Sequence, residues 1–318
     1  MRIIFAGSPS FAVPSLRRLL AGGHRIVCVV TQPARPAGRG LVLTDPPVKQ
    51  VALEAALEVH QPEKFNSPQF LGVLAAKEPD LIVTAAYGRI FKRRALDLPK
   101  LGCVNLHASL LPRYRGVAPI NWAIINGERE TGVTAFFMEE GVDTGDIIMS
   151  RATAIGGDET AGELTDRLSV LGAEVIAETC DAIARGTAAR ARQDSTQASY
   201  APKLAKDDGR VTWEAGAVSI HDRIRGVSPW PGAFCEFRGQ RLKLLASRLG
   251  EPGGALTGPP DGGRAPGRVI AIDSNMGILV SCKSESVWLK TVQAQGKKPT
   301  NGADFARGYR IKVDDAFG

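Results

Sequence analysis

Two polar side chains with complementary chemistry stand two residues apart in the stretch VNLHASLLPRYRG, residues 104–116. Asn105 and His107 fall on an expected strand, where side chains at positions i and i+2 point to the same face. An amide and an imidazole on one face can hydrogen-bond the same oxygen as it gains negative charge during a reaction. His107 considered by itself has a structural alternative: a histidine at a strand end often only satisfies a hydrogen bond.

A third group is needed to set the protonation and the orientation of the imidazole. The turn GVDTGDI, residues 141–147, supplies two candidate carboxylates, Asp143 and Asp146. Either carboxylate could simply cap the turn, which is the structural alternative for an isolated DTG. The combination of Asn, His and Asp in one domain favours acyl transfer, in which a tetrahedral oxyanion forms. The spacing alone does not choose between the two aspartates.

The elements that must position these residues follow an alternating pattern. Short, largely apolar runs predict strands buried on both faces of a parallel sheet. Helical patterns lie between them, so we expect an α/β fold with a Rossmann-like first domain, in which ligands bind at the carboxyl ends of the strands. The expected strands are 2–7, 25–30, 80–88 and 102–109, and the expected helices are 10–23, 48–59 and 67–79.

The rest of the chain predicts a second, smaller domain. A helix at 118–128, two strands at 131–139 and 145–155 and a long helix at 160–186 complete the first domain. We expect a catalytic domain over 1–190, a polar linker over 191–206 and a C-terminal domain over 207–318. Short strands and glycine-rich turns in this last part favour a small β-barrel, OB-like, or a sandwich. They are expected at 232–250, 267–273 and 277–293, with one helix at 219–227.

The composition is that of an ordinary globular protein with a positive net charge. Of 318 residues, 44% are hydrophobic and 23% charged. No apolar run approaches the roughly 20 residues needed to span a bilayer, and the N-terminus turns polar too early for a secretory signal. We therefore expect a cytoplasmic protein. The net charge is +7, with 17 Lys and Arg against 12 Asp and Glu after residue 203. A moderate positive charge can simply keep a protein in solution, and this alternative stays open. Nucleic acid is the leading functional interpretation of the charge on the second domain.

The cysteines and histidines argue against a disulfide framework and against a metal. Five cysteines are scattered along the chain without a CxxC pair, so buried reduced thiols are expected. The four histidines show no metal-ligand spacing, and we expect no metal.

The motif NLHASLLPRYRG followed by GVDTGD resembles the folate-dependent formyltransferases. The segments FAGSPSFA, AAYG, LPRYRGVAPINWAI and ETGVT extend the similarity through the first domain. The arginine-rich stretch TQPARPAGRG and the later PWPGAF and GKKP narrow it to the members that act on methionyl-tRNA. The resemblance therefore covers the whole chain.

The resemblance implies a role for each matching position. Asn105, His107 and Asp143 would be catalytic, whereas Asp146 would serve the turn. The folate site would be lined by Ser109, Leu110, Leu111 and Pro112.

An arginine-rich loop would meet the acceptor end of initiator tRNA, with Arg39 as the contact. Relatives often have lysines directly after this loop, where this chain has Leu41, Val42 and Leu43. This difference puts in doubt a purely electrostatic contribution of the loop to tRNA binding.

The implied reaction is attack by the α-amine of methionine, esterified to initiator tRNA, on the formyl carbon of 10-formyltetrahydrofolate, in translation initiation. The resemblance implies a monomer that needs no membrane. Two other classes stay open. A formyltransferase acting on a small amine, such as a nucleotide-linked amino sugar or glycinamide ribonucleotide, would not need the basic second domain. A noncatalytic RNA-binding module would explain the charge and leave the three polar residues unexplained.

Overall fold

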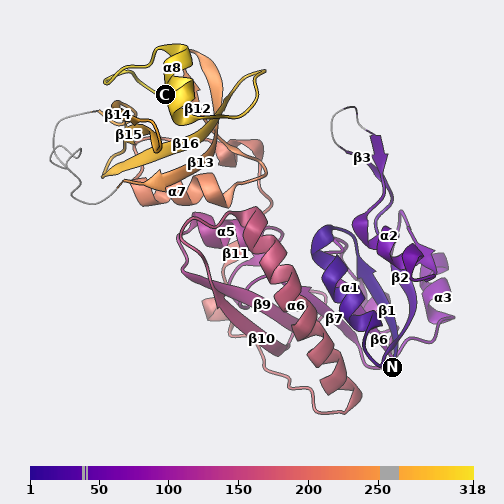
Figure 1. The fold of residues 1–318 in the computed structure, drawn as a ribbon. Coiled ribbons are helices and arrows are strands. Elements are labelled where there is room, and N and C mark those ends of the chain that lie inside the picture. Colours follow the sequence, from indigo (N-terminus) through magenta and orange to yellow (C-terminus); the bar gives the residue numbers. More distant parts are fainter. Residues whose placement is uncertain (38–39, 41, 251–264) are drawn as a thin grey trace. The chain divides into compact units, whose positions relative to one another are not determined.

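The computed structural model describes residues 1–37, 40, 42–250 and 265–318 (Figure 1). The chain packs into two compact units that interleave along the sequence. One comprises Met1–Pro119, Glu130–Ala154 and Thr165–Pro202, and the other comprises Ile120–Arg129, Ile155–Leu164 and Lys203–Gly318. The expected domain boundaries, with a linker over 191–206, stay a prediction.

The first unit is built on a seven-stranded sheet of order β10-β9-β7-β6-β1-β2-β5. Five of these strands run parallel, from β7 to β5, while β9 is antiparallel to both β7 and β10. The prediction of an α/β fold with a mostly parallel sheet is confirmed. The strands are β1 (Arg2–Gly7), β2 (Arg25–Val30), β5 (Val59–His60), β6 (Leu81–Ala85), β7 (Cys103–His107), β9 (Glu130–Phe137) and β10 (Ile147–Ala154).

Helices α1, α2 and α3 each have a proline in their first turn. Proline has no backbone N–H, and none is needed there because the first N–H groups of a helix have no acceptor within it. Ser67 also caps α3, because its side chain accepts a hydrogen bond from the backbone N–H of Phe70. The central strands are almost wholly buried, as expected for a sheet covered on both faces. The helices are α1 (Val13–Leu20), α2 (Pro47–Glu54), α3 (Pro68–Ala75), α4 (Arg93–Leu96) and α6 (Ala161–Ala184), and a 3-10 turn, η1 (Ser10–Ala12), precedes α1.

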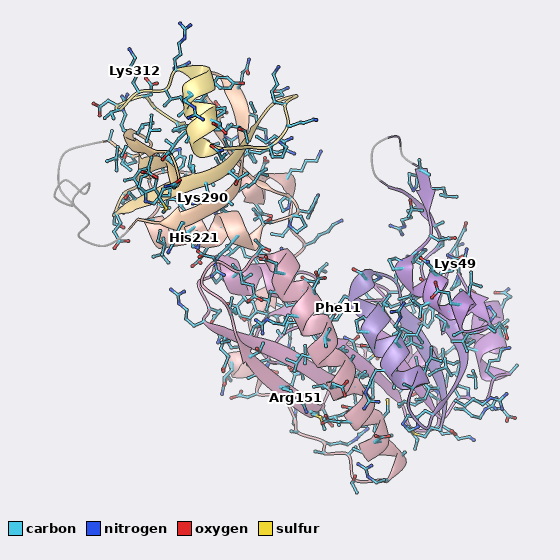
Figure 2. The ribbon with its side chains drawn as sticks, in the orientation of Figure 1. Phe11, Lys49, Arg151, His221, Lys290 and Lys312 are labelled. Carbon is cyan, nitrogen blue, oxygen red and sulfur yellow. The ribbon has the colours of Figure 1, made fainter. Side chains whose placement is uncertain are left out.

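The long helix α6 is tied to the edge strand β10 by charge as well as by packing. Arg151 on β10, labelled in Figure 2, forms an ion pair of 2.9 Å with Glu178 on α6. Both side chains are partly exposed, so this pair contributes little to stability, at most about 1 kcal/mol.

Two short strand pairs complete the first unit. β3 (Arg35–Ala37) and β4 (Val42–Thr44) form an antiparallel ribbon that stands away from the main sheet (Figure 1). Val42 and Leu43 on this ribbon are exposed. β8 (Arg115–Gly116) pairs in parallel with β11 (Tyr200–Ala201), which follows the 3-10 turn η2 (Ser195–Gln197). This second pair ties the segment after β7 to a part of the chain about 85 residues later.

The second unit is built on a six-stranded antiparallel sheet of order β12-β13-β16-β15-β14, with β17 beside β16. The predicted β character of this part of the chain is confirmed. The apolar side chains of the sheet, α7 and α8 form one core, which includes Ile224, Leu289 and Phe305. The elements are α5 (Pro119–Ile125), η3 (Lys206–Gly209), α7 (Ala217–Gly226), β12 (Ala233–Phe237), β13 (Gln240–Leu249), β14 (Val269–Asp273), β15 (Gly277–Ser281), β16 (Ser286–Ala294), β17 (Thr300–Asn301) and α8 (Gly302–Tyr309).

All five cysteines are buried free thiols, which confirms the prediction of reduced cysteines. Burial raises the pKa of each thiol to about 12, so none of them is available as a thiolate nucleophile at neutral pH. Within the described ranges, no helix has the length and apolar character needed to cross a bilayer.

Candidate active site

Asn105 lies at the middle of β7, between β6 and β9. Its neighbour in register on β6 is Thr84, whose hydroxyl donates a hydrogen bond of 2.6 Å to the Asn105 side-chain oxygen. No described residue accepts a hydrogen bond from the Asn105 amide N–H groups, so both donors remain for a substrate. Thr84 was not expected at the site from the sequence; the lone hydroxyl inside the apolar run LIVTA is the signal that could have indicated it.

His107 ends β7 and is only 6% exposed. Its Nε2 lies 2.8 Å from the backbone oxygen of Tyr114. Because a carbonyl oxygen can only accept, Nε2 carries a hydrogen and donates it there. Tyr114 has a φ of +60°, an uncommon backbone conformation for a residue with a side chain. This contact fixes the ring orientation and leaves Nδ1 as the nitrogen that can exchange a proton.

Asp143 supplies the carboxylate beside that nitrogen. Its Oδ2 lies 3.6 Å from His107 Nδ1, and it accepts a hydrogen bond of 2.8 Å from the backbone N–H of Gly116. A separation of 3.6 Å is an ion-pair distance rather than a hydrogen bond, and catalytic contacts of this kind commonly tighten when a substrate binds. The structure therefore brings His107 and Asp143 together.

The turn that carries Asp143 reaches the imidazole by doubling back along the sheet. Since β9 is antiparallel to β7, Phe137 at the end of β9 pairs with Val104 near the start of β7. The chain then returns through a turn in which Asp143 has a φ of +54°. Gly145 lies so close to the Phe137 carbonyl that any Cβ would clash with it. The glycine is therefore required for the turn to fold against β9.

Asp146 occupies a different environment from Asp143. Its side chain is 38% exposed, and its nearest cation is Arg190 at 4.0 Å. Its backbone oxygen accepts a hydrogen bond from the Phe137 N–H, which extends the ladder between β9 and β10. The structure thus places Asp143, and not Asp146, beside His107.

The four residues expected to line a folate site form the turn directly after β7. Ser109 and Leu111 are buried, and Leu110 and Pro112 are half-buried. The hydroxyl of Thr134 on β9 donates to the Ser109 carbonyl at 2.7 Å. Ser109 Oγ in turn donates to the Arg113 carbonyl at 2.6 Å. The first bond holds the turn against β9, and the second closes the turn on itself. The assignment of Ser109, Leu110, Leu111 and Pro112 to a folate site stays a prediction.

Replacing Gly116 by alanine is expected to lower kcat by about 10-fold or more, because small misplacements of a catalytic group are costly. The φ of Gly116 is +119°, and a Cβ there would lie 2.7 Å from the Ala201 carbonyl oxygen. The strand exit must then shift and move the N–H that holds Asp143. Steady-state kinetics on the folded variant provide the measurement.

Gly186→Ala is the matched control for this substitution. Gly186 also has a positive φ, +70°, but no atom lies within 4 Å of its would-be Cβ. This variant also places a side chain at a positive φ, but without a clash, and should keep the kcat of the wild type. Equal kcat values for both variants would show that the Gly116 contact to Asp143 is unimportant.

Arg39, the expected tRNA contact, lies outside the described residues. Among the residues that are described, no three His, Cys, Asp or Glu side chains gather in a way that could hold a metal ion. The groups that the structure does bring together, an amide, an imidazole and a carboxylate, can stabilise an oxyanion and relay a proton.

Comparison with known proteins identifies the chain. The family model "Formyl transferase" matches residues 1–180, and the model of the formyl transferase C-terminal domain matches residues 203–310. The chain therefore belongs to the formyl transferase family. Within that family, relatives that match the full length of this chain include methionyl-tRNA formyltransferases. The one from Geobacter sulfurreducens is 45% identical over 100% of this chain and 97% of its own length.

Solved structures share the fold at lower sequence identity. HypX from Aquifex aeolicus, in complex with tetrahydrofolic acid, matches 98% of this chain and 48% of its own, with a TM-score of 0.62 and 20% identity. Methionyl-tRNA formyltransferase from Clostridium thermocellum matches 80% of this chain and 95% of its own, with a TM-score of 0.55 and 16% identity. These likenesses support the fold described above.

Proposed function

We propose that this chain transfers the formyl group of 10-formyltetrahydrofolate to the α-amine of methionyl initiator tRNA, for translation initiation. The observation that carries the proposal is the distance of 3.6 Å between His107 Nδ1 and Asp143 Oδ2. Asn105 lies two residues before His107 on the same strand. The full-length similarity to methionyl-tRNA formyltransferases supports this substrate over a small amine.

The arrangement suits attack of an amine on a formyl carbon. A bond forms between the α-nitrogen and the formyl carbon, and the formyl oxygen becomes an oxyanion. The Asn105 amide donates to that oxygen, and a protonated His107, whose Nδ1 faces Asp143, adds a positive charge beside it. Asp143 orients the imidazole and helps to accept the proton that the amine loses. The intermediate collapses by breaking the bond to N10, and tetrahydrofolate leaves with a proton on that nitrogen.

The remaining parts of the proposal concern the cosubstrate, the partner and the location. The turn formed by Ser109, Leu110, Leu111 and Pro112 would line the folate site beside the reacting centre. The excess of basic residues after residue 203 would meet the phosphates of the tRNA. The protein would act as a monomer in the cytoplasm and would use no metal.

A comparison of formyl acceptors tests the proposal against its small-amine alternative. Initial rates would be measured with 10-formyltetrahydrofolate and charged methionyl initiator tRNA, a nucleotide-linked amino sugar or glycinamide ribonucleotide. We expect a kcat/KM for the charged tRNA at least about 10³-fold above either small amine, because binding energy from the rest of the tRNA is used at the reacting centre. A faster reaction with either small amine would reverse the assignment.

Arg39→Ala is expected to lower formylation of charged tRNA by about 10²-fold, a loss typical of lost substrate positioning. The planar guanidinium fork is suited to phosphate, so Arg39→Lys should restore only part of the rate. The measurement is kcat/KM for charged tRNA and for a small methionyl ester.

The small ester is the control, because it does not reach beyond Asn105, His107 and Asp143. Its slow reaction should survive in Arg39→Ala. Equal losses with both substrates would mean that Arg39 serves the catalytic centre or the fold and does not grip tRNA.

A further inference from the structure

A glutamine far along the chain connects the two segments that carry His107 and Asp143. The Nε2 of Gln193 donates hydrogen bonds of 2.9 Å and 2.8 Å to the backbone oxygens of Asp143 and Gly145. Its Oε1 accepts from Nε and Nη2 of Arg115 at 3.1 Å and 2.7 Å. Arg115 is the first residue of β8, next to the Gly116 that holds the Asp143 carboxylate.

This network defines the orientation of the Gln193 amide without ambiguity. A guanidinium can only donate hydrogen bonds and a backbone carbonyl can only accept them, so oxygen must face Arg115 and nitrogen must face the turn. All four hydrogen-bonding positions of the amide are used. A glutamate of the same shape could still accept from Arg115, but its second oxygen would face two carbonyl oxygens.

The burial of the pair shows that it does not act as an ordinary surface contact. Arg115 is 3% exposed and Gln193 is 7% exposed. Within the described part of the chain, no carboxylate lies within ion-pair distance of the Arg115 guanidinium. A buried cation held by one neutral partner is costly for stability. This pair therefore points to a role in holding the site and not to a gain in stability.

The segment around Gln193 is also fixed to the other side of the site. The backbone N–H of Arg115 donates to the Ser199 carbonyl at 2.8 Å, and the N–H of Tyr114 donates to Ser199 Oγ at 2.9 Å. Tyr114 is the residue whose carbonyl orients His107. The segment 193–199 therefore holds the backbone beside the imidazole and the backbone beside the carboxylate at once.

We infer that Gln193 and Arg115 are positioning residues that set the distance between His107 and Asp143, and so act on the chemical step through Asp143. This inference rests on the proposed role of Asp143. Neither side chain needs to touch the substrate for this role.

Gln193→Glu is the decisive variant, because it keeps the acceptors for Arg115 and removes the donors to the turn. We expect kcat to fall by about 10²-fold, as for a misplaced catalytic group, while KM for both substrates changes by less than about threefold. Gln50→Glu is the matched control: Gln50 is an exposed residue of α2 and lies outside the segments that carry the site. It should keep the wild-type kcat.

A double variant separates positioning from a general effect on the fold. In an Asp143→Asn background, Gln193→Glu should lower the single-turnover rate by less than about threefold, because two groups acting through one contact are not additive. A purely structural role would give the full loss in both backgrounds. If Gln193→Glu does not fold, Gln193→Met, of similar size, takes its place in the same comparison.

The outcomes distinguish this inference from the proposed function. A wild-type kcat for the folded Gln193 variant, together with a severe loss for Asp143→Asn, would overturn the inference alone. So would equal losses from the Gln193 substitution in both backgrounds. A wild-type rate for Asp143→Asn would overturn the proposed role of Asp143 first, and the inference with it.

Discussion

Replacing Asn105 or His107 by alanine is expected to lower the rate of the chemical step by about 10²-fold or more, the usual cost of losing one donor to an oxyanion. The Asn105 oxygen is already occupied by Thr84, so its amide N–H groups are the part available to the substrate. His107 is held by the Tyr114 carbonyl with Nδ1 toward Asp143. Single-turnover formylation of charged tRNA, at saturating enzyme and folate, measures this step.

His24→Ala is the matched control for the histidine. His24 also has a nearly buried side chain and lies 3.0 Å from an aspartate, Asp181, but it precedes β2, at the opposite end of the parallel strands from His107. Its replacement should leave the rate of the chemical step unchanged. Folate affinity, followed by fluorescence titration, should change little in Asn105→Ala and His107→Ala. Wild-type rates for these two variants would remove both residues from the mechanism.

Asp143→Asn is expected to lower kcat by about 10²-fold or more, because the amide keeps the shape of the side chain but cannot stabilise a charged imidazole. Asp146→Asn should change kcat by less than about threefold, since its carboxylate is partly exposed and has only a distant contact with Arg190. Both variants remove one negative charge from the same turn, so each controls for the other. The measurement is kcat together with the midpoint of thermal unfolding.

The reverse ordering would contradict the account. If Asp146→Asn abolished turnover while Asp143→Asn did not, the carboxylate needed for the reaction would be Asp146 and not Asp143. A large loss of stability in either variant would appear in the unfolding midpoint and is thereby separated from a loss of catalysis.

The sequence predicted the sheet and the residue pair on β7 because both depend on local patterns. Apolar runs separated by helical patterns indicate a parallel sheet, and β7 was expected within two residues of where it lies. The period of two along a strand is enough to place Asn105 and His107 on one face. No knowledge of distant contacts is needed for either conclusion.

The rest of the site depends on contacts that a local pattern does not contain. Only the antiparallel pairing of β9 with β7 shows that the turn with Asp143 must double back to His107. Thr84 lies beside Asn105 because of the register between β6 and β7. Gln193 lies in a polar stretch that was expected to be a linker, and only its contact with Asp143 connects it to the site. The helix α8 was also missed, since only one helix, at 219–227, was expected in the second domain. It has eight residues, two of them glycines, which weaken the helical signal. Its cap, in which the Asn301 side chain accepts from the Asp304 N–H, was not enough to indicate it.

The most direct test of the account is to follow a labelled formyl group from 10-formyltetrahydrofolate in a single turnover with the purified chain and charged methionyl initiator tRNA. We expect the label to be recovered as N-formylmethionine after hydrolysis of the tRNA ester. The deacylated tRNA should gain no label, and Asp143→Asn should slow the transfer by about 10²-fold. Label that stays on the folate with the wild-type chain, or transfer that is as fast in Asp143→Asn, would contradict it.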